Sequence, residues 1–216
     1  FIGGSQTIEA FQNIGGADFP FQRTGLFLSK GIASPFSIQS LQGTFVFIGS
    51  GQNESPAIWA FEGNDAVKIS TTAIDKELSN LTQDQVTSIY SWGYAEKGAY
   101  FVGFALPSST LVYDIITKRW HERKSVIEGD LGGYRVTALV RAYNKIWAGD
   151  LVDGRIGNLD PDFYTEYGTE IRRSIVTQPF QNNMESFVVP EIELTVESGV
   201  GNASAPDPQI GMARSR

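Results

Sequence analysis

The sequence predicts an all-β fold: a β-propeller of about four or more antiparallel blades, present as the whole ring or as part of it. A hydrophobic pair followed by glycine occurs four times, as Phe1-Ile2-Gly3, Phe47-Ile48-Gly49, Phe101-Val102-Gly103 and Trp147-Ala148-Gly149. The offsets between these copies are 46, 54 and 46 residues, and another strand-like segment follows each copy. A period in the forties with several strands per repeat is typical of propeller blades. A single β-sandwich with evenly spaced hairpins is the alternative that this pattern leaves open.

Residues 99–123 show the repeating unit most clearly. Two apolar runs, 100–106 and 110–114, flank a Pro-Ser-Ser turn, and a third strand at 119–123 follows a short polar loop. The runs are rich in β-branched and aromatic residues, which favour strands. Asp114 and Thr117 carry short side-chain oxygens that can accept hydrogen bonds from the backbone of a turn. We therefore expect a three-stranded meander here.

The remaining elements are expected in chain order. Residues 1–13 form a first hairpin, and residues 14–37 form an irregular connection packed by its own apolar side chains. The second blade is expected to have strands at 37–42, 44–50, 57–62 and 66–70. The third is expected to have them at 86–94, 99–106, 110–115 and 119–123, and the fourth at 135–142, 145–150, 155–159 and 170–176. Glycines supply the turns, and residues 125–134 read as a glycine-rich loop.

One short helix is expected between blades, over residues 72–85. Thr72 is placed as its N-cap, and Ile74, Leu78 and Leu81 recur at helical spacing. The opposite face of this helix is polar and is expected to be solvated.

The blades are expected to occupy residues 1–178. Residues 179–216 are either a strand that closes the ring or the start of a further β domain, and the sequence leaves both open. The chain opens directly in a strand without Met and ends in a strand-like segment. We therefore expect it to be truncated at both ends.

The composition limits the function classes. The chain has 216 residues, 41% of them hydrophobic, so it can fold around a core. It has no cysteine, which excludes disulfides and cysteine-bound zinc, and it has no apolar run of membrane-spanning length. Its net charge of −7 disfavours non-specific binding to nucleic acid.

No catalytic constellation is predicted. His121 is the sole histidine, and it lies on a predicted outer strand, where a general base is poorly placed. The acidic residues Glu122, Asp150, Asp153, Asp160 and Asp162 show no spacing that fixes the separation of two carboxylates. The sequence therefore predicts neither an enzyme nor a cofactor.

The loop 149–162 is the candidate metal site. It offers hard oxygen ligands suited to calcium, from Asp150, Asp153, Asn158, Asp160 and Asp162. The spacing matches no EF-hand, and Asp or Asn beside Gly or Pro is typical of turns. We favour the turn interpretation, with no metal.

A basic cluster lies at residues 118–124. It contains Lys118, Arg119, His121, Arg123 and Lys124, and the strand period of two puts Arg119, His121 and Arg123 on one face. This face can contact a phosphate or a partner. It can also be an outer edge strand that its charges protect from aggregation, which is the interpretation we favour. The tryptophans are assigned to the blade cores; they are Trp59, Trp92, Trp120 and Trp147.

Several of these segments resemble one family, the packaged-DNA stabilisation proteins, or tail accessory factors, of short-tailed bacteriophages. The resemblance spans about residues 33–210 and rests on Ala33-Ser34-Pro35-Phe36-Ser37, residues 67–71 with Ala73-Ile74-Asp75, Val112-Tyr113-Asp114 with Thr117 and residues 120–123, residues 197–201, and Asp207-Pro208-Gln209. Thr72 departs from the histidine typical of the family.

The resemblance implies a virion protein of the tail nozzle or hub, assembled in the host bacterial cytoplasm. It implies a homo-oligomeric ring with six-fold symmetry, which contacts portal and adaptor proteins above and tail needle and tailspike proteins below. Phage DNA would pass through it without sequence specificity, and an acidic wall would not adhere to the phosphates. The alternatives are a carbohydrate-active propeller enzyme and a soluble propeller adaptor that binds peptides.

Overall fold

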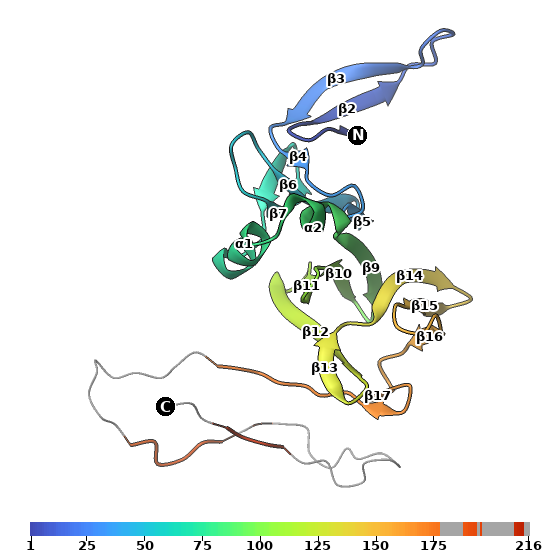
Figure 1. Cartoon of the computed structure of the whole chain (residues 1–216). Coiled ribbons are helices and arrows are strands. Elements are labelled where there is room, and N and C mark those ends of the chain that lie inside the picture. Colours follow the sequence, from blue (N-terminus) through green and yellow to red (C-terminus); the bar gives the residue numbers. More distant parts are fainter. Residues whose placement is uncertain (178–187, 194, 196–209, 214–216) are drawn as a thin grey trace. The chain divides into compact units, whose positions relative to one another are not determined.

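The computed structural model of the chain describes residues 1–177, 188–193, 195 and 210–213. The chain divides into two compact units, Phe1–Arg172 and Arg173–Arg216. The first unit holds every strand and helix of the described residues (Figure 1). None of the helices found there is long and apolar enough to cross a membrane.

The first unit begins with two antiparallel sheets. The first sheet has the order β1-β2-β3, with bounds Ile2–Gly3, Ile8–Asn13 and Phe21–Leu28. The second has the order β4-β6-β7-β8, with β5 also paired to β6; its strands are β4 (Gly31–Ile32), β5 (Gln39–Leu41), β6 (Thr44–Ser50), β7 (Ala57–Glu62) and β8 (Asp65–Lys68). In most of both sheets, strands that follow one another in the sequence are therefore hydrogen-bonded to one another.

Two further sheets and a small hairpin follow. The third sheet runs in simple chain order through β9 (Tyr90–Glu96), β10 (Ala99–Ala105), β11 (Thr110–Asp114), β12 (Arg119–Ile127) and β13 (Asp130–Gly133). The fourth contains β14 (Val136–Ala142), β15 (Lys145–Asp150) and β16 (Ile156–Leu159), and a last hairpin pairs β17 (Thr165–Glu166) with β18 (Thr169–Glu170). The described residues therefore confirm the all-β prediction of successive antiparallel meanders.

Tight turns set the register of these hairpins. Two-residue turns join six strand pairs, and in five of them both turn residues have positive φ: Gln42-Gly43, Lys97-Gly98, Glu128-Gly129, Tyr143-Asn144 and Tyr167-Gly168. Two successive left-handed residues match the right-handed twist of the flanking strands. Glycine usually occupies the second position because it adopts positive φ without steric cost.

Two short helices, rather than one, separate the second and third sheets. Helix α1 (Thr72–Ser79) is capped by the side chain of Thr71, one residue before the predicted cap, and α2 (Gln83–Ser88) has a capping box between Thr82 and Gln85. Ile74 and Leu78 are buried, as their spacing predicts. The expected strand 86–94 therefore starts later, because Val86 lies in α2.

The core lies between successive sheets. In β6, Val46 and Ile48 belong to a cluster formed with the helices and with Val102 and Phe104 of the third sheet. Phe47, between them in sequence, points into a second cluster with residues of the first sheet, Ile8 and Leu28. Since alternate side chains of a strand point to opposite faces, β6 is buried on both sides.

The repeated glycines mark places where the strand and its neighbour approach closely. A Cβ atom at Gly103 would overlap the ring of Trp92, one at Gly49 would overlap the carbonyl of Gly31, and one at Gly3 would overlap the side chain of Ile32. Gly149 is less confined, because its nearest neighbour is Thr137 Oγ1 at 3.2 Å. The motif therefore has a steric cause in three of its four copies.

Several expected boundaries are wrong. The connection 14–37 contains strands β3 and β4, and all four of its phenylalanines are exposed rather than buried. The expected loop 125–134 contains the end of β12 and all of β13. The expected strand 170–176 is absent from the structure, in which β18 ends at Glu170. Within residues 179–216 the structure describes 188–193, 195 and 210–213 and assigns no strand to them, so the nature of this segment stays a prediction.

We expect Gly103→Ala to lower the free energy of unfolding by about 1–3 kcal/mol, because the methyl group would displace the Trp92 ring. Gly133→Ala is the matched control, since an added Cβ there meets nothing within 4 Å. Denaturant unfolding followed by tryptophan fluorescence measures both changes. Equal stability of the two variants would contradict a steric role for the motif.

Candidate functional site

The basic strand face lies on β12, where Arg119, His121 and Arg123 alternate along the strand as predicted. Their cross-strand partners on β11 are Asp114, Val112 and Thr110. Arg119 is exposed, and no ion pair is found for it within the described residues. Lys124 points the other way and pairs with Glu122 at 3.2 Å.

Arg123 is held by an aromatic cage and is not free to contact a phosphate. Its guanidinium carbon lies 5.2–5.9 Å from the centres of four rings, which belong to Trp92, Tyr94, Phe101 and Tyr134. Its Nη2 donates to the Tyr94 hydroxyl at 2.7 Å. A guanidinium over aromatic faces is stabilised by the ring quadrupoles, so this cation is part of the sheet packing.

His121 accepts a hydrogen bond at Nε2 from Arg123 Nε at 3.3 Å, and its ring packs edge-on against Phe101. Partial desolvation and the positive charge of Arg123 lower the pKa of His121. An imidazole that accepts from a guanidinium must be neutral at that nitrogen. His121 is therefore an acceptor that orients Arg123.

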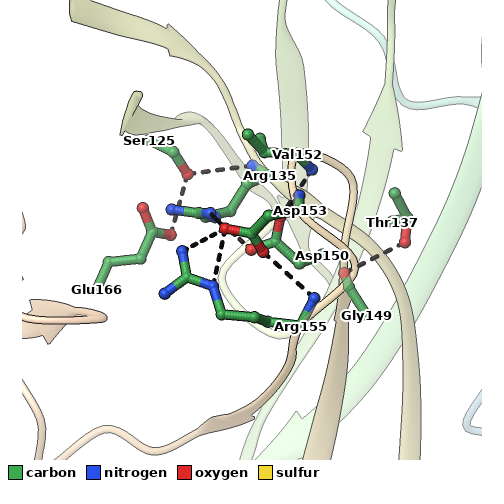
Figure 2. A network of polar contacts seen from close by, with 9 residues as sticks. All are labelled: Ser125, Arg135, Thr137, Gly149, Asp150, Val152, Asp153, Arg155 and Glu166. Carbon is green, nitrogen blue, oxygen red and sulfur yellow. Dashed lines mark hydrogen bonds and ion pairs between the residues drawn. The ribbon is translucent and has the colours of Figure 1, made fainter. Parts of the chain in front are cut away.

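The acidic loop after β15 is organised by a buried ion pair (Figure 2). Arg135 Nε donates a hydrogen bond to Asp150 Oδ2, and the side chains of Arg135 and Asp150 are only 8% and 1% exposed. Asp150 Oδ1 also accepts from the backbone N–H groups of Val152, at 2.7 Å, and Asp153, at 3.3 Å. Burial raises the pKa of Asp150, but these hydrogen bonds outweigh it and hold the pKa below its usual value.

Further groups extend this pair into a network. Asp153 accepts from Arg135 Nη2 at 3.1 Å and from Arg155 Nε at 2.8 Å, so two guanidinium groups flank one carboxylate (Figure 2). Both guanidinium groups also lie over the ring of Tyr167, at 4.8 and 3.9 Å. The network joins the start of β14 to the loop after β15 and to the β17–β18 turn.

A second branch reaches the third sheet. Ser125 Oγ on β12 accepts from the Arg135 backbone at 3.1 Å and donates to Glu166 at 3.0 Å (Figure 2). Burial raises the pKa of Glu166. These contacts hold the strands β12, β14 and β17 in fixed relation.

The four aspartates among the candidate calcium ligands are not brought together. Asp150 and Asp153 face arginines, whereas Asp160 caps a turn through the N–H of Asp162, and Asp162 pairs with Lys97 at 3.0 Å on the surface. Among the residues that the structure describes, no group of three acidic or histidine side chains could hold a metal ion. Calcium at Asp150 and Asp153 would have to displace two guanidinium groups.

Sequence reasoning missed the basic half of this network. Arg135 precedes Asp150 by 15 residues in the chain, and Arg155 follows Asp153 by 2 residues. Arginines on both sides of an aspartate pair were the available signal, because buried carboxylates need a compensating charge. No pattern in the sequence indicated that Tyr134 would lie against Arg123 or that Glu166 would accept a hydrogen bond from Ser125.

Replacing Arg123 with Met is expected to raise the pKa of His121 toward its ordinary value of about 6.5, because a nearby positive charge is removed. The rise is partial, since desolvation remains. NMR titration of the imidazole gives the value directly, with Arg119→Met as the control on the same strand face. A titration midpoint that Arg123→Met leaves unchanged would argue against the contact.

We expect Asp150→Asn to lower the free energy of unfolding by about 1.5–3 kcal/mol at pH 7, because it removes the buried carboxylate that faces Arg135 Nε and leaves only the partly exposed Asp153 to balance that charge. The exposed Asp162→Asn should cost no more than about 1 kcal/mol. The folded pKa of Asp150 lies below the unfolded value of about 3.9, so its stabilisation is present above that pH and is lost as the pH falls through the folded pKa.

Urea unfolding at a series of pH values tests this prediction. The stability difference between the parent and Asp150→Asn should narrow in acid. A constant difference would show that the charge of Asp150 is not what stabilises the loop.

Comparison with known proteins places this fold in a family. The family model described as "Bacteriophage P22 Gp10, beta-propeller" matches residues 1–164. No curated protein matches the chain. The matched range covers all four sheets described above and most of the first unit. The successive antiparallel meanders are therefore propeller blades, and the chain belongs to the phage stabilisation protein family.

Proposed function

We propose that this chain is a structural component of a phage tail nozzle or hub that closes the DNA exit channel and stabilises the packaged DNA. The match of a phage stabilisation family model to residues 1–164 is the observation that carries this proposal. The fold agrees with a structural role, because the network around Arg135 and Asp150 links strand β12 to the segment before β14 and to β17.

The proposed assembly is a homo-oligomeric, six-fold ring in the virion. Portal and adaptor proteins would lie above it, and the tail needle and tailspike proteins would attach to it. Host cytoplasmic assembly is part of the same proposal, and it agrees with a chain that contains no cysteine.

The proposed mechanism depends on charge. A chain with net charge −7 presents an average field that repels phosphates, so a channel wall of this kind would not hold DNA by adhesion. Retention would then come from steric closure by attached parts, and the DNA could slide out once the closure opens.

The role that we propose is non-enzymatic. Catalytic carboxylates need room for a substrate, but Asp150 is buried and saturated by Arg135 and two backbone N–H groups. The basic face offers a contact for a partner or a phosphate only through Arg119, because Arg123 is caged and His121 orients it.

The test is DNA retention by particles assembled without this protein. We expect such particles to package DNA and then lose it, because the exit channel stays open. The measurement is the fraction of packaged DNA that becomes sensitive to nuclease, compared with particles to which the protein is supplied in trans.

A mutant with a defect elsewhere in the tail, which keeps this protein, controls for non-specific leakage. Particles that lack the protein and still keep their DNA would refute the proposed function. Measurable hydrolysis of host glycans by the purified protein would favour the enzyme alternative instead.

A further inference from the structure

The β2–β3 hairpin differs from the other hairpins of the first unit. Its turn spans seven residues, 14–20, and is closed by a hydrogen bond from Ile14 N to Pro20 O of 2.7 Å. Six other described hairpins have two-residue turns, and the remaining turns span four to six residues. The long turn and the residue after it carry exposed apolar side chains, Ile14, Phe19 and Phe21, where hairpin tips are ordinarily polar.

The outer half of this hairpin is not covered by the rest of the described chain. Only Leu28, the last residue of β3, is buried in that strand, and the Phe19 side chain at the tip is 65% exposed. An isolated two-stranded hairpin is marginally stable in water. An arm of this kind, with phenylalanines at its tip, is suited to burial against another molecule.

The fourth sheet exposes an apolar surface that could receive such an arm. Cross-strand partners share a face, so the pairs Val140–Trp147 and Gly149–Ile156 place Val140, Trp147 and Ile156 on one side. Val140 and Ile156 are 60% and 73% exposed. We call this side, with Ala138 and Lys145, the outer face of β14–β16.

The charges of the two surfaces are complementary. Asp18 is the one charged residue between Ile14 and Phe21. On the outer face of β14–β16 the charged side chain is Lys145, which lies 5.7 Å from the centre of the Trp147 ring. In the part of the chain that the structure describes, neither Asp18 nor Lys145 has an ion-pair partner.

We propose that the β2–β3 arm of one copy docks on the outer face of β14–β16 in a second copy of this chain. Phe19 and Phe21 would pack against Val140 and Ile156, and Asp18 would pair with Lys145. Two different surfaces on one molecule make a head-to-tail contact, which closes into a ring when the rotation between copies allows it. This inference rests on the proposed ring and names the surfaces that build it.

Cysteine cross-linking tests the contact directly, because the chain contains no cysteine of its own. The full-length protein carrying Phe19→Cys and Val140→Cys, in assembled particles and in purified oligomers, should give a ladder of disulfide-linked copies after mild oxidation. Phe36→Cys with Val140→Cys is the matched control, because Phe36 is equally exposed, at 69%, and lies outside the arm. The control pair should remain unlinked.

A charge swap supplies the second test. Asp18→Lys and Lys145→Asp should each weaken self-association about tenfold, and the two together should restore it to within about threefold. Lys76→Glu, an exposed lysine on α1, should leave it unchanged. Sedimentation velocity over a range of protein concentrations measures the dissociation constant of each variant. The double substitution Phe19→Ser with Phe21→Ser, which removes both aromatic side chains of the arm, should weaken association about 30-fold or more.

The outcomes separate this inference from the proposed function. If particles keep their DNA only when the protein is present, but no cross-link forms between the cysteines at positions 19 and 140, the arm contact is wrong and the proposed function still holds. A charge swap that fails to rescue association would also overturn it. A ladder together with rescue would establish the head-to-tail contact even if DNA retention proved independent of this protein.

Discussion

The burial of β6 on both of its faces is the constraint on which the packing of the first unit depends. Val46 and Ile48 require cover from the third sheet and the helices, and Phe47 requires cover from the first sheet. Each fully buried side chain of this size contributes about 1.5–3 kcal/mol. The neighbouring sheets must therefore lie close on either side, and Gly3 of the first sheet permits such an approach, since an added Cβ there would overlap Ile32 of the second sheet.

Two arginines in this chain contribute to cohesion rather than to ligand binding. Arg123 is enclosed by aromatic rings, and Arg135 is paired with Asp150 where neither reaches solvent freely. A buried ion pair adds little stability compared with an apolar equivalent, but the loss of one partner is costly, so such pairs fix the arrangement of the segments that carry them. Fixed geometry of this kind agrees with the structural role proposed above.

The predictability of the fold follows from how regular each segment is. The bounds 44–50, 57–62 and 145–150 were predicted correctly, and the strand expected at 110–115 ends one residue earlier, because alternation and turn residues mark these segments. Strand β3 was missed because it is exposed on both sides and shows no alternation. Helix α2 was partly read as a strand because its main signal is a capping box. The Asp150 site was located, but its chemistry was not, since Arg135 lies 15 residues away.

Within the described part of the first unit, each sheet packs its apolar core mainly against the preceding and the following sheet, which has a consequence for cooperativity. When each layer contacts just the preceding and following layers, stability becomes a sum of local and nearest-neighbour contributions, as in linear repeat proteins. Amide hydrogens of β6 and β10, which lie at the two sides of the main cluster, should then exchange with solvent most slowly. Exchange should quicken outward toward β1 and β16, so opening would proceed from the ends of the series inward.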